Sequence, residues 1–216
     1  MKTVFIAGAH GDTGRYIVEQ LNRKGCFTIA LVKQEDQINT LPSNNVKCIV
    51  GDLSNALSDH WKDADAIICA AGTGMEQQHE EADQAGIIRL IEQAVLQGIP
   101  RFILISSMDT RQPERQPAAK PFLLAQSTAE HQLEESGLTY TIIRLGELSD
   151  EEPAGMAAAG HSLEDPRILS KADAAHAAVL SLELPQTENI TFDLAGGDTP
   201  LKEALIQLVE KEDVPE

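Results

Sequence analysis

Three glycines near the amino terminus have a spacing that lets a polypeptide backbone hold a diphosphate. Gly8, Gly11 and Gly14 follow a short apolar run and precede an amphipathic stretch. In that setting Gly8 allows a tight exit from a strand, Gly11 a close approach of the backbone to a pyrophosphate, and Gly14 close packing of a helix on a sheet. Free N–H groups and the dipole of the helix that begins around Asp12 and Thr13 would hold the anion.

Other residues are placed to contact the remaining parts of a dinucleotide. His10 lies inside the glycine loop and can reach the diphosphate through its backbone. Lys33 follows the second apolar run, where sites that prefer NAD often carry an acidic residue for the ribose 2′-hydroxyl. Because a basic side chain suits a 2′-phosphate, Lys33, assisted by Arg15, favours NADP, with NAD as the alternative. The alternative is that Lys33 is a solvated surface lysine and that Arg15 faces solvent from the first turn of the helix.

Residues after the next two apolar runs complete this candidate cofactor site. Asp52 is placed to accept a hydrogen bond from the adenine amino group, with Leu53 against the ring. Capping the following helix is an equal alternative for Asp52. Ala70, Ala71 and Gly72 are small enough for their backbone to pass close to a ribose.

Short apolar runs alternate with amphipathic stretches along the chain. The first six of seven runs are almost continuously apolar, which is typical of parallel strands covered on both faces. This order predicts an α/β protein with a doubly wound, mostly parallel sheet in a three-layer αβα arrangement. The 216 residues suit a single domain, 1–216. Strands are expected at 3–7, 28–32, 47–51, 66–70, 101–106, 140–144 and 190–194, and helices near 13–24, 55–62, 79–98, 123–136, 171–183 and 200–211.

Several helix boundaries are marked by residues that favour them. Gly25, Gly98 and Gly137 stand where glycine commonly follows the end of a helix. Thr199 followed by Pro200 predicts the N-cap and first residue of the last helix.

Two less regular segments follow the carboxyl ends of predicted strands, where ligands bind in open α/β sheets. Segment 108–121 contains three prolines, and segment 145–169 is rich in glycine and other small residues. We interpret both as candidate substrate loops, because connections of this length are often functional. Ordinary surface connections are the alternative.

The composition limits the kinds of partner that the chain can have. Its net charge is −17, whereas nucleic acids and anionic membranes are bound by positively charged surfaces. No uncharged apolar run approaches the ~20 residues of a membrane-spanning helix. The three scattered cysteines suit buried positions in a reducing compartment. We therefore expect a cytoplasmic protein that binds a dinucleotide and a small molecule, with neither nucleic acid nor membrane as a partner.

The chain carries six motifs in order: GAHGDTG (8–14), GDL (51–53), AAG (70–72), ISS (105–107), SGLTYTIIRLG (136–146) and FDLAGGDTP (192–200). This set resembles the atypical short-chain dehydrogenase/reductase family, especially its small NmrA-like, NAD(P)-binding members. The resemblance spans nearly the whole chain. It implies a Rossmann-type fold with NADP(H) bound at the carboxyl edge of the strands, and it leaves the substrate open.

By this resemblance, Ser107 matches the Ser or Thr just beyond the fifth strand and is the candidate catalytic residue, with Ser106 beside it near the cofactor. The family then has Tyr-x-x-x-Lys on the next helix, where this chain has Phe122 and Gln126. In the family the tyrosine is the acid or base, and the lysine lowers its pKa and holds the nicotinamide ribose. Phe122 has no proton to donate, whereas Gln126 can still hydrogen-bond the ribose.

The segment after the sixth strand also departs from the family pattern. Leu145 stands where a proline usually shapes the nicotinamide pocket, and Gly146 follows it. We expect both residues to lie at the cofactor, in a nicotinamide pocket whose shape differs from that of the family.

Other proton donors do not replace the missing tyrosine. Tyr16 lies on the first predicted helix, and Tyr140 and Arg144 lie on a predicted strand, where four residues span about 13 Å. His131 lies off the matching helix face. His161 can reach a substrate from the late loop, although a solvated position is the alternative. We therefore interpret both tyrosines as structural.

These residues favour hydride transfer without an internal acid. Ketone reduction needs a proton, and a positioned acid typically contributes ~10²–10⁴-fold, so this reaction is disfavoured. A flavin or quinone can take its proton from water, with Ser107 only orienting it. We expect an NADP(H)-binding oxidoreductase-like protein that reduces such an acceptor. The alternative is a non-catalytic NADP(H)-binding redox sensor that reports to a protein partner; sugar-nucleotide epimerisation, which also needs the tyrosine, is least favoured.

Overall fold

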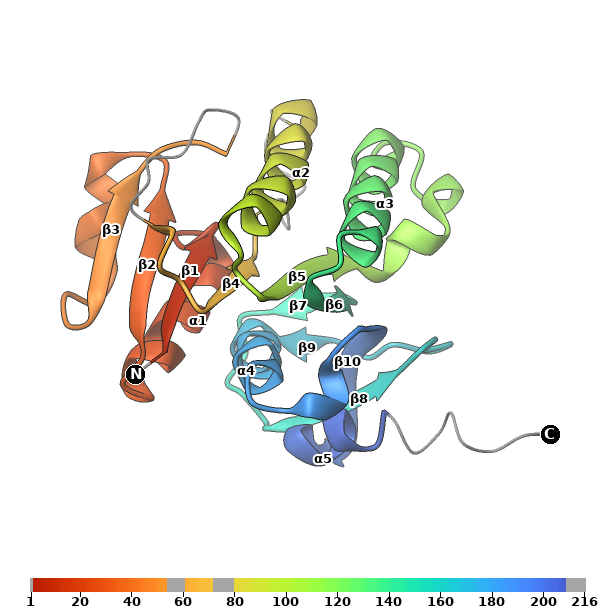
Figure 1. The fold of residues 1–216 in the computed structure, drawn as a ribbon. Helices are drawn as coiled ribbons and strands as arrows, with labels where there is room; N and C mark the ends of the chain where they lie inside the picture. The colour runs from red at the N-terminus through yellow and green to blue at the C-terminus, as the bar shows by residue number, and fades with distance from the viewer. Residues whose placement is uncertain (1, 54–60, 72–79, 209–216) are drawn as a thin grey trace.

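The computed structural model describes residues 2–53, 61–71 and 80–208, within which eight strands form one sheet (Figure 1). The strand order is β3-β2-β1-β4-β5-β6-β10-β8, and all neighbours are parallel except β10 and β8. The predicted doubly wound, mostly parallel sheet is confirmed. Its strands are β1 (Thr3–Ala7), β2 (Phe27–Val32), β3 (Val46–Val50), β4 (Ala66–Cys69), β5 (Arg101–Ser107), β6 (Thr139–Leu145), β8 (Met156–Gly160) and β10 (Ile190–Pro200).

Helices cover both faces of the sheet, so the fold has the three layers expected (Figure 1). Because side chains alternate along a strand, Val4 and Ile6 of β1 enter one core and Phe5 enters the other. Burial on both faces explains why the strands are almost continuously apolar. The face of Ile6 is covered by α1 (Asp12–Arg23), α4 (Lys171–Ser181) and α5 (Leu201–Ile206), and the face of Phe5 by α2 (Glu80–Gln97) and α3 (Lys120–Glu135).

The predicted helix boundaries are confirmed in part. Gly25, Gly98 and Gly137 each have the left-handed backbone conformation that glycine adopts after a helix. The prediction for Thr199 and Pro200 is wrong. Both residues belong to β10, because Pro200 pairs with Met156 of β8, and α5 begins at Leu201.

The two candidate substrate loops contain more regular structure than their sequences predict. Segment 108–121 forms two 3-10 turns and the start of α3, and segment 145–169 contains β8, a strand of alanines that the sequence did not predict. Alanine and glycine have weak strand propensity, so pairing with β10 decides this conformation. Most of the helix expected at 55–62 lies outside the described residues. The remaining elements are η1 (Glu35–Thr40), η3 (Met108–Arg111), η4 (Pro113–Arg115), β7 (Leu148–Ser149), β9 (Leu169–Ser170) and η5 (Pro185–Thr187).

Candidate functional site

The glycine loop between β1 and α1 is packed so closely that side chains would not fit. A β-carbon added to Gly14 would lie 2.0 Å from the carbonyl oxygen of Gly8. At Gly8, where φ is +78°, an added β-carbon would lie 2.7 Å from the backbone nitrogen of Ala71. The loop therefore lies directly against the end of β4, and it brings together two stretches that the sequence assigned to one cofactor site.

The amino terminus of α1 presents backbone N–H groups that the helix itself does not use. Gly11 is its N-cap residue, and the first helical hydrogen bond runs from the N–H of Arg15 to the Gly11 carbonyl. The N–H groups of Asp12, Thr13 and Gly14 therefore have no acceptor within the helix. Among the described residues, no side chain caps this end of α1. The crowded glycines and the uncapped helix end fit a diphosphate group.

The residues expected to contact the nucleoside parts of the cofactor differ in how exposed they are. Lys33 is exposed just beyond β2, and its N–H donates to the Gln37 side chain at 2.8 Å. Arg15 is half-exposed and lies 3.6 Å from Asp12, while His10 is partly buried. Leu53 is only 6% exposed. Gly72 lies outside the described residues.

Leu53 lies against α2, and two alanines, Ala70 and Ala71, directly follow β4. A β-carbon added to Gly86 of α2 would lie 2.5 Å from the β-carbon of Leu53, so the two backbones approach closely there. Asp52 is partly buried, Ala70 is buried and Ala71 is half-buried. Leu53 thus supports α2 at the position where the sequence suggested an adenine contact.

A row of three polar residues crosses the sheet near the carboxyl ends of its strands. Ser106 of β5 pairs in register with Arg144 of β6, which pairs with Asp193 of β10. Parallel register points all three side chains to one face. Ser106 is 3% exposed, and its hydroxyl donates to the carboxylate of Glu130 on α3 at 2.5 Å. Next along the chain, the Ser107 hydroxyl accepts from the N–H of Asp109 at 3.2 Å and caps η3.

Glu130 is the centre of this polar network. Its carboxylate is 1% exposed and accepts from Nη2 of Arg144 at 2.6 Å and from Nε at 3.2 Å. Thr110 of η3 donates a further hydrogen bond at 3.2 Å. The sequence reasoning missed Glu130, although it stands one helical turn after Gln126 on the same side of α3. Spacing alone cannot identify the strand residue that neutralises a buried carboxylate.

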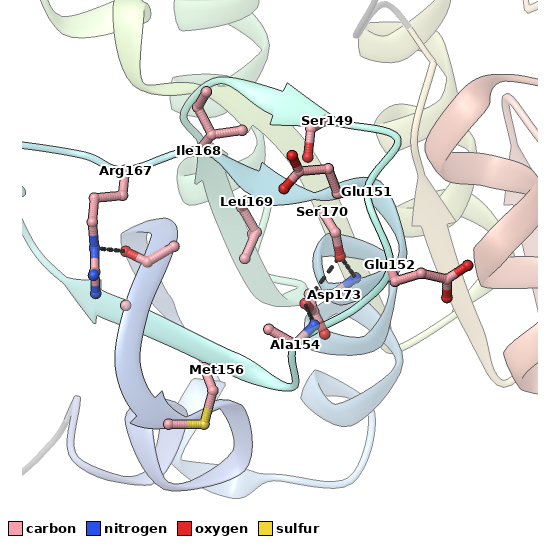
Figure 2. A pocket seen from close by; sticks show the side chains of 12 residues that line it. Ser149, Glu151, Glu152, Ala154, Met156, Arg167, Ile168, Leu169, Ser170 and Asp173 are labelled. Atoms are coloured by element: carbon pink, nitrogen blue, oxygen red, sulfur yellow. Dashed lines mark hydrogen bonds between the residues drawn. The ribbon is translucent and has the colours of Figure 1, made fainter.

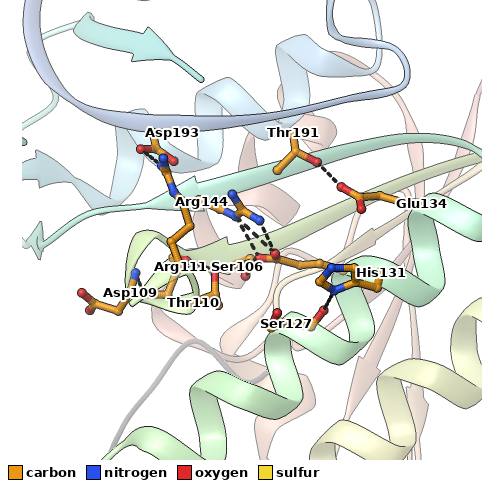
Figure 3. A network of polar contacts seen from close by, with 12 residues as sticks. Ser106, Asp109, Thr110, Arg111, Ser127, His131, Glu134, Arg144, Thr191 and Asp193 are labelled. Atoms are coloured by element: carbon orange, nitrogen blue, oxygen red, sulfur yellow. Dashed lines mark hydrogen bonds and ion pairs between the residues drawn. The ribbon is translucent and has the colours of Figure 1, made fainter. Parts of the chain in front are cut away.

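A second ion pair connects the two candidate substrate loops. Arg111 of η3 forms an ion pair with the fully buried Asp193 (Figure 3). Arg111 also donates to the His161 carbonyl at 3.0 Å. The N–H of Leu163 also donates to Asp193, at 3.0 Å. Burial, followed by the nearby positive charge of Arg144, lowers the pKa of Arg111. Hydrogen bonds and an ion pair therefore link segments 108–121 and 145–169 to each other and to β10.

The positions that match the family's tyrosine and lysine are both buried. Phe122 is 8% exposed and packs with Ala119 and Leu123, and Gln126 is 4% exposed. His131 is exposed and contacts the Ser127 carbonyl at 2.6 Å. The phenylalanine thus lies in an apolar cluster at the start of α3, without an ionisable group of its own.

The surroundings of the two tyrosines indicate structural roles. Tyr16 and Tyr140 each pack against a hydrophobic core, and burial raises the pKa of Tyr140. Tyr140 and Arg144 both lie on β6, as predicted, and Arg144 is engaged with Glu130. His161 is exposed. Leu145 is buried at the end of β6, and Gly146 lies beside Met108 of η3.

A separate small cavity of about 180 Å³ lies beside β7, β9 and the start of α4 (Figure 2). Its lining includes Asp173, whose carboxylate accepts from the N–H groups of Ala154 at 2.9 Å and Gly155 at 3.1 Å, and from Ser170. These bonds give Asp173 a structural role as the anchor of the loop. The cavity is smaller than the ~300–1,000 Å³ typical of ligand pockets.

Within the described ranges, no three His, Cys, Asp or Glu side chains gather as metal ligands. No helix in those ranges has the length and apolar character needed to cross a membrane.

Known proteins resemble this chain over almost its full length. A family model described as NAD(P)H-binding matches residues 8–185. The Bacillus subtilis protein YhfK, called an uncharacterised sugar epimerase, is 36% identical over 95% of this chain and 99% of its own. A Bacillus halodurans structure, provisionally assigned as an NAD-dependent epimerase/dehydratase, has 30% identity and a TM-score of 0.89 over 96% of this chain and 100% of its own. A Veillonella parvula short-chain dehydrogenase/reductase in complex with NADP shares the fold, with 16% identity and a TM-score of 0.72 over 92% of this chain and 96% of its own.

Proposed function

We propose that this chain, which belongs to the NAD(P)H-binding family of the atypical short-chain dehydrogenase/reductase kind, reduces a conjugated acceptor. The acceptor is a quinone or a flavin, and NADPH is the hydride donor. The observation that carries the proposal is the crowded glycine loop, in which a side chain at Gly14 would meet the Gly8 carbonyl at 2.0 Å. Such packing presents the N–H groups of α1 to a diphosphate.

The chain's own residues would hold the dinucleotide at the carboxyl edge of the sheet. The N–H groups of residues 12–14 bind the diphosphate, and the backbone of Ala70 and Ala71 borders a ribose. Lys33 and Arg15 meet the 2′-phosphate, which is the reason to prefer NADP to NAD. Leu145 and Gly146 border the nicotinamide.

A bound NADPH supplies the hydride, so the protein's task is to position the acceptor. The buried Phe122 cannot protonate the acceptor, and the carboxylates of Glu130 and Asp193 are each paired with an arginine. A ketone would therefore lack the proton that it needs. A reduced quinone or flavin anion takes its proton from water, and Ser107 orients it.

Epimerisation, suggested by the names of two relatives, is a weaker proposal for this chain. It requires a group that removes and returns a proton at the sugar or at its hydroxyl. The position that supplies this group in the family is the buried Phe122.

The acceptor would bind between segments 108–121 and 145–169, within a single domain. Arg111, which contacts both the buried Asp193 and the His161 carbonyl, holds the two segments together. The same link supports the alternative proposal of an NADPH-dependent sensor, because a change at either segment would reach the other.

The test mixes purified protein with NADPH and a panel of quinones and flavins while nicotinamide absorbance is followed. A UDP-sugar incubated with NAD, and a simple ketone, serve as controls for the disfavoured reactions. We expect oxidation of NADPH with at least one conjugated acceptor and none with the ketone. Tight NADPH binding without turnover would instead support the sensor, and epimerised sugar would overturn the proposed reaction.

A further inference from the structure

Lys171, the first residue of α4, reaches across to the glycine-loop end of α1. Its Nζ lies 2.7 Å from a carboxylate oxygen of Asp12 and 2.9 Å from one of Asp150. The Lys171 side chain is only 17% exposed, whereas Asp12 is 64% exposed and Asp150 is 81% exposed. The lysine is therefore held in place between two carboxylates, unlike a freely moving surface lysine.

Asp12 carries a negative charge at a place that is proposed to bind an anion. It is the first residue of α1, the helix whose amino terminus is proposed to hold the diphosphate. One carboxylate there suits the helix dipole, but it repels a second anion at the same place. The hydrogen bond from Lys171 lowers the pKa of Asp12, and the bond to Asp12 raises the pKa of Lys171. Both groups are thus charged at neutral pH.

Resting on the proposed cofactor site, we infer that Lys171 is a positioning residue for the dinucleotide, which neutralises Asp12 so that a diphosphate can approach the amino terminus of α1. Arg15 is a weaker partner for this purpose. It lies 3.6 Å from Asp12 and is 49% exposed, so solvent screens the pair.

A purely structural role for Lys171 would be to dock α4 against α1. The structure offers a matched control for that role at the opposite end of the same two helices. There the Lys24 amine, just after α1, lies 2.9 Å from Glu183, just after α4. Removing Lys24 deletes an ion pair between the same two elements but far along α1 from the glycine loop.

The experiment measures NADPH affinity by fluorescence titration for wild type, Lys171→Met, Asp12→Asn, the double variant and Lys24→Met. Thermal unfolding checks that each variant is folded. We expect Lys171→Met to weaken NADPH binding about three- to tenfold, which lies within the range for one charge in a partly buried position beside a helix terminus. In the Asp12→Asn background the same change should cost less than about twofold, because the carboxylate at the amino terminus of α1 is then absent and Lys171 retains only Asp150 as a partner. Added salt should reduce the loss in the single variant.

Three results would overturn the inference. An equal loss in the Asp12→Asn background would mean that Lys171 contacts the cofactor directly. An equal loss in Lys24→Met would mean that helix docking is the cause. Unchanged affinity in Lys171→Met would mean that the charge of Asp12 does not matter. If wild type binds neither NADPH nor NADH, the proposed function itself fails, and the inference fails with it.

Discussion

Replacing Gly14 by alanine tests the cofactor loop most directly, because the structure determines the size of the disturbance. The new β-carbon would lie 2.0 Å from the Gly8 carbonyl oxygen, whereas β-carbons essentially never come closer than 3.0 Å to another atom. Backbone atoms form the obstacle, so the start of α1 and the Gly8 carbonyl must move apart until the contact lengthens from 2.0 to about 3.0 Å. Overpacking of this kind typically costs about 1–3 kcal/mol of folding free energy.

The larger effect falls on cofactor binding. A shift of this size breaks hydrogen bonds from N–H groups to the charged diphosphate, and each such bond contributes about 1.5–3 kcal/mol. Loss of two bonds therefore lowers NADPH affinity by at least about 100-fold. Calorimetric titration with NADPH measures the affinity, and urea unfolding measures the stability.

Gly25→Ala is the matched control at the other end of α1. Gly25 has φ of +72° and no atom within 4 Å of an added β-carbon, so alanine there costs only backbone strain of about 1–2 kcal/mol. NADPH affinity should be unchanged in this variant. A folded Gly14→Ala protein that binds NADPH like wild type would refute the assignment, and an equal affinity loss in Gly25→Ala would assign the effect to stability alone.

Three further predictions concern the network, the missing acid and the choice of cofactor. Glu130→Ala should destabilise the protein by about 3–5 kcal/mol in urea unfolding, because it leaves Arg144 unpaired in a mostly buried position. Adding Arg144→Met should recover much of this loss, and equal instability of the double variant would contradict an ion-pair origin. Phe122→Tyr with Gln126→Lys should raise NADPH-dependent ketone reduction about 100-fold by supplying an acid; no gain in a folded variant would place the nicotinamide elsewhere. Lys33→Ala should weaken NADPH about tenfold in parallel titrations and leave NADH unchanged, and an unaltered ratio would reject the 2′-phosphate assignment.

The fold could be predicted because local patterns and global packing agree. Continuous apolar runs such as FTIALV are typical of strands covered on both faces, and the glycine loop is typical of a turn between a strand and a helix. The strand β8 could not be predicted in this way. Its residues MAAAG have no strand preference of their own, and the antiparallel partner that orders them is more than thirty residues away in sequence.

The candidate site shows the same division between local and distant information. Ser107 and Phe122 could be singled out from motif positions, since their neighbours in sequence define the motif. Glu130 could not, because its importance depends on Arg144, which parallel register brings beside Ser106 from another strand. The pairing of two loops through Arg111 likewise depends on the buried carboxylate of β10.

The amino-acid sequence by itself determined the doubly wound sheet, the glycine loop and the absence of a tyrosine at position 122, since each depends on residue types and short spacings. Only the tertiary structure decided which charges meet: Glu130 with Arg144, and Lys171 with Asp12. The physical reason is that a hydrophobic pattern is set by one face of one element, whereas an ion pair needs two side chains whose approach depends on how separate elements pack.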